Sequence, residues 1–142
     1  MDRLDREVLK CADRVVQMSR DRGGEVLDYT DGSIDLVEEM LAEAAAHARR
    51  MSEAALRRLS QDVGCYILEV ARRNHGGAYV WAADRNEPSL VAGEPHFAIT
   101  LFCWDKVYAR LRGAEAHDIP AFYAAYAQGV REAKHGDRIV FL

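Results

Sequence analysis

The chain has 142 residues, 49% of them hydrophobic and 30% charged, which is enough apolar material for one globular domain spanning residues 1–142. Its formal net charge of −4 offers no basic face to a phosphate backbone, so we do not expect it to bind nucleic acid. No apolar run approaches the ~20 residues that cross a bilayer, and the charged residues 1–20 exclude a secretory signal, so we expect a cytoplasmic protein without membrane contact.

The three cysteines, Cys11, Cys65 and Cys103, are odd in number, far apart and without a CxxC pair. This pattern favours reduced thiols in a cytosol over a disulfide framework or a structural zinc site. The five histidines include no HxxxH or HExxH spacing. The sequence therefore predicts neither a metal site nor a cofactor.

Two amphipathic helices are predicted first. Apolar residues recur three and four positions apart over residues 4–18, and Gly23-Gly24 ends this pattern. The same spacing returns over residues 34–48, with Thr30 as the predicted N-cap. The alanine-rich second half of this helix indicates close contact with other helices.

The third predicted helix, roughly residues 52–74 with Ser52 as its N-cap, is apolar around most of its circumference. Gly64 in its middle costs about 1 kcal/mol relative to alanine, and we expect another backbone to come close to it in compensation. Residues 74–77, which include two glycines, end the helix before a strand. The polar stripe of this helix consists of Asp62, Cys65, Glu69, Arg72 and Arg73. Any site on the helix would lie on this stripe.

Strand patterns with a period of two follow the third helix. Runs of β-branched and aromatic residues occupy 79–81 and 97–102, a weaker run lies near 89–91, and turn-rich segments separate them. We therefore expect a small antiparallel sheet of about three strands.

Two C-terminal helices are predicted next, one at residues 105–113 and one opened by Asp118 and Pro120. The tail 139–142 is too apolar to lie free in water, so it either adds an edge strand or docks on the core. The sequence thus predicts an α+β fold with three N-terminal helices, a small antiparallel sheet of about three strands and two C-terminal helices.

Residues 64–81 carry the pattern G-x-Y-x-x-E-x-x-R-R-N-x-G-G-x-x-x-W. Together with residues 102–110 and the helix around Phe122-Tyr123, this pattern resembles a family of small uncharacterised bacterial domains, over roughly the C-terminal two-thirds of the chain. The resemblance implies a bacterial α+β domain of unknown function. It supplies no catalytic residues to carry over.

The polar stripe holds the first candidate site. Glu69 precedes Arg72 and Arg73 at the spacing of ion pairs along a helix, worth only about 0.3–0.5 kcal/mol each when exposed. The alternative is a partly buried carboxylate that forms a polar pocket beside the sheet with both guanidinium groups and Cys65. His75 lies at the helix end, where the free carbonyl groups favour a protonated imidazole, so we expect it to act as a C-terminal cap.

Tyr79 and Trp81 form the second candidate site, because they share one face of their strand while Val80 points to the other. Such an aromatic pair usually packs in a core. If this face is uncovered, it is a binding surface that Phe102 and Trp104 would enlarge.

These features favour a binding or interaction protein over an enzyme, and no residue is assigned as catalytic. The expected partner is another protein, which would contact the sheet face or the stripe around Glu69 and Arg73. The alternative is a small hydrolase or transferase in which Glu69 acts as acid or base and Arg72 and Arg73 hold an anionic substrate. A scaffold role as a homodimer also remains open.

Overall fold

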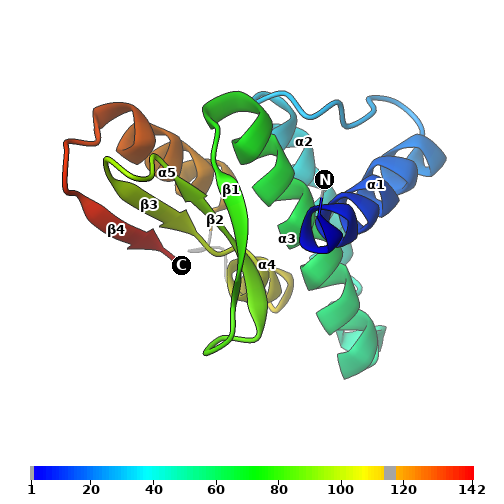
Figure 1. Ribbon diagram of the computed structural model, residues 1–142. Coiled ribbons are helices and arrows are strands. Elements are labelled where there is room, and N and C mark those ends of the chain that lie inside the picture. The colour runs from blue at the N-terminus through cyan, green and yellow to red at the C-terminus, as the bar shows by residue number, and fades with distance from the viewer. Residues whose placement is uncertain (1, 114–117) are drawn as a thin grey trace.

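The computed structural model describes residues 2–113 and 118–142. Within them the elements follow in the order α1 (Arg3–Arg22), α2 (Ser33–Ala45), the short 3-10 helix η1 (Ala48–Arg50), α3 (Glu53–His75), β1 (Ala78–Ala82), β2 (Glu87–Ala92), β3 (Ala98–Leu101), α4 (Trp104–Leu111), α5 (Ile119–Glu132) and β4 (Arg138–Phe141) (Figure 1). The predicted α+β class is confirmed, with three α-helices before β1 and two after β3 in the described part of the chain.

Side-chain caps fix where three of the helices begin. In each case the capping oxygen accepts a hydrogen bond from the backbone N–H three residues later: Asp2 at α1, Ser52 at α3 and Asp118 at α5. The predicted caps of α3 and α5 are confirmed. The predicted Thr30 cap of α2 is wrong, because α2 begins at Ser33 with Gly32 at the N-cap position, and the Thr30 hydroxyl donates to Asp28.

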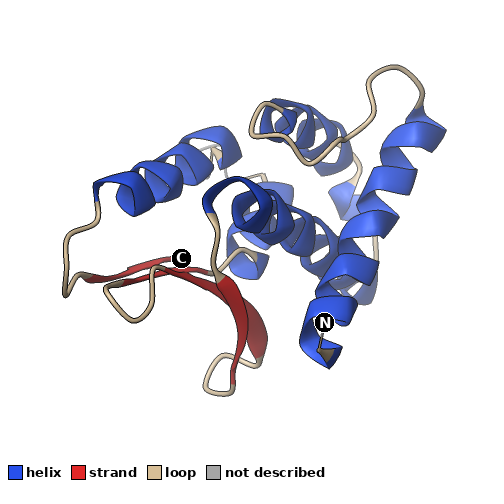
Figure 2. Ribbon diagram, turned by 45° about the horizontal axis from the view of Figure 1, so that its top comes forward, coloured by secondary structure: helices blue, strands red, loops and turns tan. Residues whose placement is uncertain are grey.

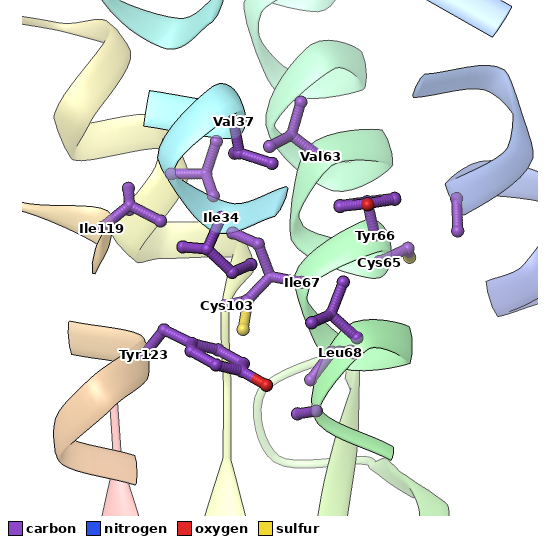
Figure 3. Close-up of a cluster of buried hydrophobic side chains, with 14 of the residues drawn as sticks. Ile34, Val37, Val63, Cys65, Tyr66, Ile67, Leu68, Cys103, Ile119 and Tyr123 are labelled. Carbon is purple, nitrogen blue, oxygen red and sulfur yellow. The ribbon is translucent and has the colours of Figure 1, made fainter. Parts of the chain in front are cut away.

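Helix α3 runs through the middle of the molecule, and every residue from Asp62 to Ala71 is buried. Its residue Ile67 shares one apolar cluster with Ile34 of α2 and Ile119 of α5 (Figure 3). Other helices and the inner face of the sheet therefore surround α3, as its apolar circumference predicts.

Gly64 lies where α3 meets the start of α4. A Cβ atom at this position would lie 3.3 Å from both the Cα and the N of Trp104 and 2.6 Å from its Cδ1. Backbone atoms cannot move aside without shifting α4, so glycine is required here. The predicted close approach of another backbone to Gly64 is confirmed.

Four strands form one mixed sheet in the order β1-β2-β3-β4. The pairs β1/β2 and β2/β3 are antiparallel, whereas β3 and β4 run parallel. The three predicted strands are present and antiparallel to one another, but the predicted strand number is wrong, because a fourth strand is present and its parallel pairing makes the sheet mixed.

The extra strand comes from the apolar tail, which pairs with β3 from Arg138 to Phe141. Helix α5 carries the chain back across the helical side of the sheet, so the tail enters beside the start of β3 and runs in the same direction (Figure 1). The ring of Phe141 then packs edge-on against Tyr126 of α5, with 5.7 Å between centroids. Of the two alternatives for the tail, the edge strand is the one found.

The helices lie on one side of the sheet, as Figure 2 shows. The inner face meets them with buried residues such as Leu90 and Leu101, which pair across β2 and β3. No described helix covers the outer face, where Val80 and Val140 are 46% and 56% exposed. The strand β1 forms one edge of this half-open sheet.

Candidate functional site

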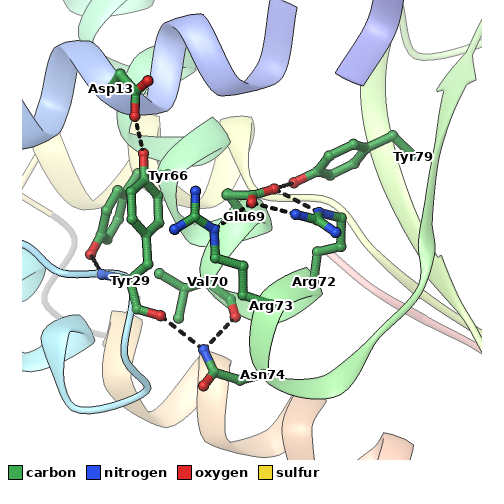
Figure 4. Close-up of polar contacts among 9 residues, drawn as sticks. All are labelled: Asp13, Tyr29, Tyr66, Glu69, Val70, Arg72, Arg73, Asn74 and Tyr79. Atoms are coloured by element: carbon green, nitrogen blue, oxygen red, sulfur yellow. Dashed lines mark hydrogen bonds and ion pairs between the residues drawn. The ribbon is translucent and has the colours of Figure 1, made fainter. Parts of the chain in front are cut away.

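Glu69 is completely buried, yet its carboxylate accepts four hydrogen bonds (Figure 4). Arg72 donates through both Nε and Nη2, at 2.8 and 2.6 Å. Arg73 donates through Nε and Tyr79 through its hydroxyl, each at 2.6 Å. We call these four residues the Glu69 cluster. Because both carboxylate oxygens are engaged, the cluster leaves no oxygen free for a substrate.

The environment of the Glu69 cluster fixes its protonation state. Burial alone would raise the pKa of Glu69, but the hydrogen bonds from Arg72, Tyr79 and Arg73 outweigh it and lower the pKa below the ordinary value. Burial, together with the hydrogen bond to Glu69, raises the pKa of Tyr79. A carboxylate held ionised in this way is a poor proton donor, so the geometry gives the hydrolase hypothesis no support.

A tyrosine from the connection between α1 and α2 extends the Glu69 cluster. The guanidinium of Arg73 lies over the ring of Tyr29, 3.7 Å from its centroid. The hydroxyl of Tyr29 donates to Asp13 at 2.5 Å, and its backbone N–H donates to the Tyr66 hydroxyl at 3.0 Å. Asn74 donates to the backbone carbonyl of Tyr29 at 2.9 Å. The cluster thus joins α3 to β1 on one side and to α1 and its following loop on the other (Figure 4).

His75 lies apart from the Glu69 cluster. Its Nε2 is 3.1 Å from Oδ1 of Asp31, and the hydroxyl of Tyr123 donates to the same oxygen. The backbone N–H of Gly76, bonded to the carbonyl of Arg72, closes the end of α3 instead. The expectation that His75 caps the helix is therefore wrong, because its ring is drawn to the carboxylate of the loop before α2.

A cleft of about 670 Å³ opens between the N-terminal half of α1 and the β1–β2 hairpin. Leu4 and Val8 of α1, Cys65 of α3, Trp81 of β1 and Trp104 of α4 line it. We call it the α1–β1 cleft. Trp81 is 47% exposed at its wall. The indole Nε1 of Trp104 is buried beside the Cys65 thiol and makes no regular hydrogen bond within the described residues, which leaves a donor unused.

The structure divides the predicted site residues between two places. The Glu69 cluster unites Glu69, Arg72, Arg73 and Tyr79, whereas Cys65 and Trp81 line the α1–β1 cleft. The expected pocket that joins Cys65 to Glu69 does not form, because the Cys65 side chain is buried against α1 while the carboxylate turns to Tyr79 of β1.

The two aromatic residues of β1 share a face but not an environment. Tyr79 is buried within the Glu69 cluster, while Trp81, two residues nearer the turn, borders the α1–β1 cleft. Trp104 enlarges this surface as predicted. Phe102 does not contribute, because it is buried beneath the guanidinium of Arg85, 4.8 Å from its ring centroid.

Sequence inspection missed a second buried carboxylate, Glu87 at the start of β2. It is 3% exposed, its Oε1 has no hydrogen-bond partner within the described residues, and its Oε2 lies 3.4 Å from Nε of Arg85. Burial raises the pKa of Glu87, and the nearby guanidinium of Arg85 only partly offsets this. A turn-rich segment surrounds Glu87 in sequence, so no local pattern distinguishes it from an exposed turn residue.

Among the described residues, no helix combines the length and the apolar character needed to cross a membrane. The same residues contain no group of three or more His, Cys, Asp or Glu side chains that could hold a metal ion. Comparison with protein-family models, with curated proteins and with solved structures finds no match to this chain. The resemblance to uncharacterised bacterial domains therefore stays a prediction.

Proposed function

We propose that the protein is a binding module that receives an extended apolar segment of a partner protein at the edge of β1 and in the α1–β1 cleft. The observation that carries this proposal is the position of Trp81. A tryptophan that is 47% exposed, on an edge strand and at the wall of a cleft, is typical of a contact residue in a protein interface.

The edge of β1 provides the backbone for such a contact. β2 pairs with one side of β1, and no described strand pairs with the other. An edge strand leaves backbone N–H and C=O groups unpaired, and an extended peptide can bind them by adding a strand. Because side chains alternate along a strand, the peptide would place one set beside Trp81 and the other beside the exposed Val80.

The lining of the α1–β1 cleft specifies the chemistry of the partner segment. Apolar walls from Leu4, Val8 and Pro88 favour an aliphatic or aromatic side chain. A segment with apolar residues at alternate positions satisfies this requirement.

The Glu69 cluster lies between β1 and α3 and helps to hold the edge strand in place. Tyr79, two residues before Trp81, is held to the fully buried Glu69 of α3. This link holds β1, which forms one wall of the cleft, against the central helix. The guanidinium groups of Arg72 and Arg73 are engaged with Glu69, so we favour the sheet edge over the polar stripe as the contact surface.

The test is selection of short random peptides displayed on phage, followed by titration of the best peptide against the purified protein. We expect apolar residues at alternate positions, a change in tryptophan fluorescence, and amide chemical-shift changes concentrated in β1. Trp81→Ala should weaken binding about 30-fold, which corresponds to about 2 kcal/mol. Val26→Ala is the matched control, since Val26 is 41% exposed but does not line the cleft.

Enrichment of no peptide would contradict the proposal, as would equal affinities of the parent and the Trp81→Ala variant. Sedimentation of the parent protein without peptide tests whether the protein associates with a second copy of itself. Self-association that Trp81→Ala abolishes and Val26→Ala preserves would make a second copy of this chain the partner.

A further inference from the structure

Two cysteines from different helices meet beside the α1–β1 cleft. Cys11 of α1 and Cys65 of α3 are both free thiols, and they lie close enough for each to shift the pKa of the other. Both line the cleft, although Cys11 is partly exposed and Cys65 is buried. An oxidant small enough to enter the cleft can therefore reach Cys11 with Cys65 directly behind it.

The ion pair between Arg14 and Asp62 holds the Arg14 guanidinium against Cys11, the more accessible of the two thiols. Asp62 of α3 accepts hydrogen bonds from Arg14 at 3.1 and 3.3 Å, and its side chain is only 5% exposed. The Nη2 of Arg14 in turn donates to Sγ of Cys11 at 3.1 Å. A guanidinium fixed at this distance stabilises a thiolate, the nucleophilic form of cysteine.

The surroundings shift the pKa values of the two thiols in opposite directions. The neighbouring Cys65 side chain and the charge of Arg14 lower the pKa of Cys11 despite its partial burial. The neighbouring Cys11 side chain and burial raise the pKa of Cys65. Cys11 is thus suited to attack an electrophile, and Cys65 is suited to remain a thiol until a neighbouring sulfur is activated.

We propose that Cys11 and Cys65 form a peroxide-reactive dithiol, oxidised to a disulfide that links α1 to α3. The Cys11 thiolate attacks one oxygen of a hydroperoxide, the O–O bond breaks, and the released hydroxide or alkoxide takes up a proton. Sγ of the resulting sulfenic acid is then attacked by Cys65, which loses its proton as the S–S bond forms and water leaves. The two thiols lose two electrons and two protons, and hydrogen peroxide is reduced to two waters.

The closeness of the two side chains makes the second step sterically simple. Both thiols line the same cleft, and the ion pair between Arg14 and Asp62 joins α1 to α3 about one helical turn from each of them. The third cysteine, Cys103, is fully buried and has a raised pKa, so it serves as an unreactive internal reference. This inference does not depend on what binds in the α1–β1 cleft.

The experiment treats the folded, reduced protein with one equivalent of hydrogen peroxide and maps disulfides by peptide mass spectrometry without reduction. We expect a Cys11–Cys65 cross-link and unmodified Cys103. In Cys65→Ala, the Cys11 sulfenic acid should accumulate and be trapped by dimedone. Arg14→Gln should slow both peroxide oxidation and iodoacetamide alkylation of Cys11 by at least about tenfold at neutral pH.

A second measurement on the parent protein keeps the test independent of variants that weaken the fold. Cys11 should react with iodoacetamide faster than the thiol of glutathione at the same neutral pH. Alkylation no faster than that of glutathione would overturn the proposal. Recovery of Cys11 and Cys65 without a mutual cross-link after peroxide treatment would overturn it as well.

Discussion

Tyr79 on β1 donates its hydroxyl proton to Glu69 on α3 at 2.6 Å, and both side chains are buried. The bond joins the edge strand of the sheet to the helix at the centre of the molecule. Because the acceptor is ionised, it belongs to the stronger class of hydrogen bonds. This contact, together with the pairing of β1 with β2, positions the strand that forms one wall of the α1–β1 cleft.

Removing the hydroxyl group of Tyr79 should show how much its hydrogen bond to Glu69 contributes to the free energy of unfolding. We expect Tyr79→Phe to lower the free energy of unfolding by about 1.5–3 kcal/mol, because a buried bond to a charged group is lost. Urea denaturation followed by circular dichroism gives the value. Tyr108→Phe is the matched control, since its hydroxyl donates to Glu53 at 2.7 Å on the surface. Equal losses in the two variants would contradict a special role for the buried bond.

Replacing the carboxylate of Glu69 with a neutral amide should lower the free energy of unfolding more at neutral pH than in acid. Glu69→Gln leaves two guanidinium groups without their partner, and we expect a loss of at least about 2 kcal/mol at pH 7. The pKa of Glu69 is lowered by folding, so its stabilising effect is present above its ordinary value of 4.5 and is lost as the pH falls through the folded-state pKa. The stabilities of parent and variant should therefore converge in acid, which urea denaturation from about pH 6 to about pH 3 would check. A difference that stays constant over this range would count against the assignment.

Glu87 should show the opposite dependence on pH. Its pKa is raised by burial, so its contribution to stability is fully present below 4.5 and is lost as the pH rises through the folded-state pKa. We expect Glu87→Gln to increase the free energy of unfolding at pH 7 by about 1 kcal/mol, and the gain to vanish in acid. Glu94→Gln, at an exposed position, serves as the control. A destabilised Glu87→Gln at pH 7 would show that the ion pair with Arg85 outweighs the burial.

Substitution of Gly64 should be harmful although alanine favours helices. The added Cβ would lie within 3.3 Å of two backbone atoms of Trp104, so α4 has to shift. We expect Gly64→Ala to cost about 1–3 kcal/mol, more than the helix propensity of alanine returns. Gly32→Ala is the control, because its Cβ would meet only the hydroxyl of Thr30, at 4.0 Å. A melting temperature of Gly64→Ala at or above that of the parent would refute the packing argument.

The helices could be predicted from the sequence because their signals are local. Ser52 and Asp118 cap the helices that they precede, and the apolar circumference of α3 corresponds to its burial. The sheet could be predicted only in part, because the partner and direction of β4 depend on where α5 delivers the chain. No pattern within residues 138–141 carries that information.

The candidate site could be predicted to the extent that it lies along one helix. The spacing of Glu69, Arg72 and Arg73 indicates their ion pairs, and the structure contains them. Tyr29 could not be predicted as a neighbour of Arg73, because a loop between α1 and α2 places it there. The α1–β1 cleft and the contact between Cys11 and Cys65 likewise arise from packing of segments that are distant in sequence.

The parallel strand β4 has a consequence for the order of folding. Short links, residues 83–86 and 93–97, join β1 to β2 and β2 to β3, so these strands can pair early at little entropic cost. β4 reaches β3 only after residues 102–137, which include α4 and α5. Until those helices have docked, the outer edge of β3 stays open, and the tail of a neighbouring unfolded chain can occupy it in place of β4.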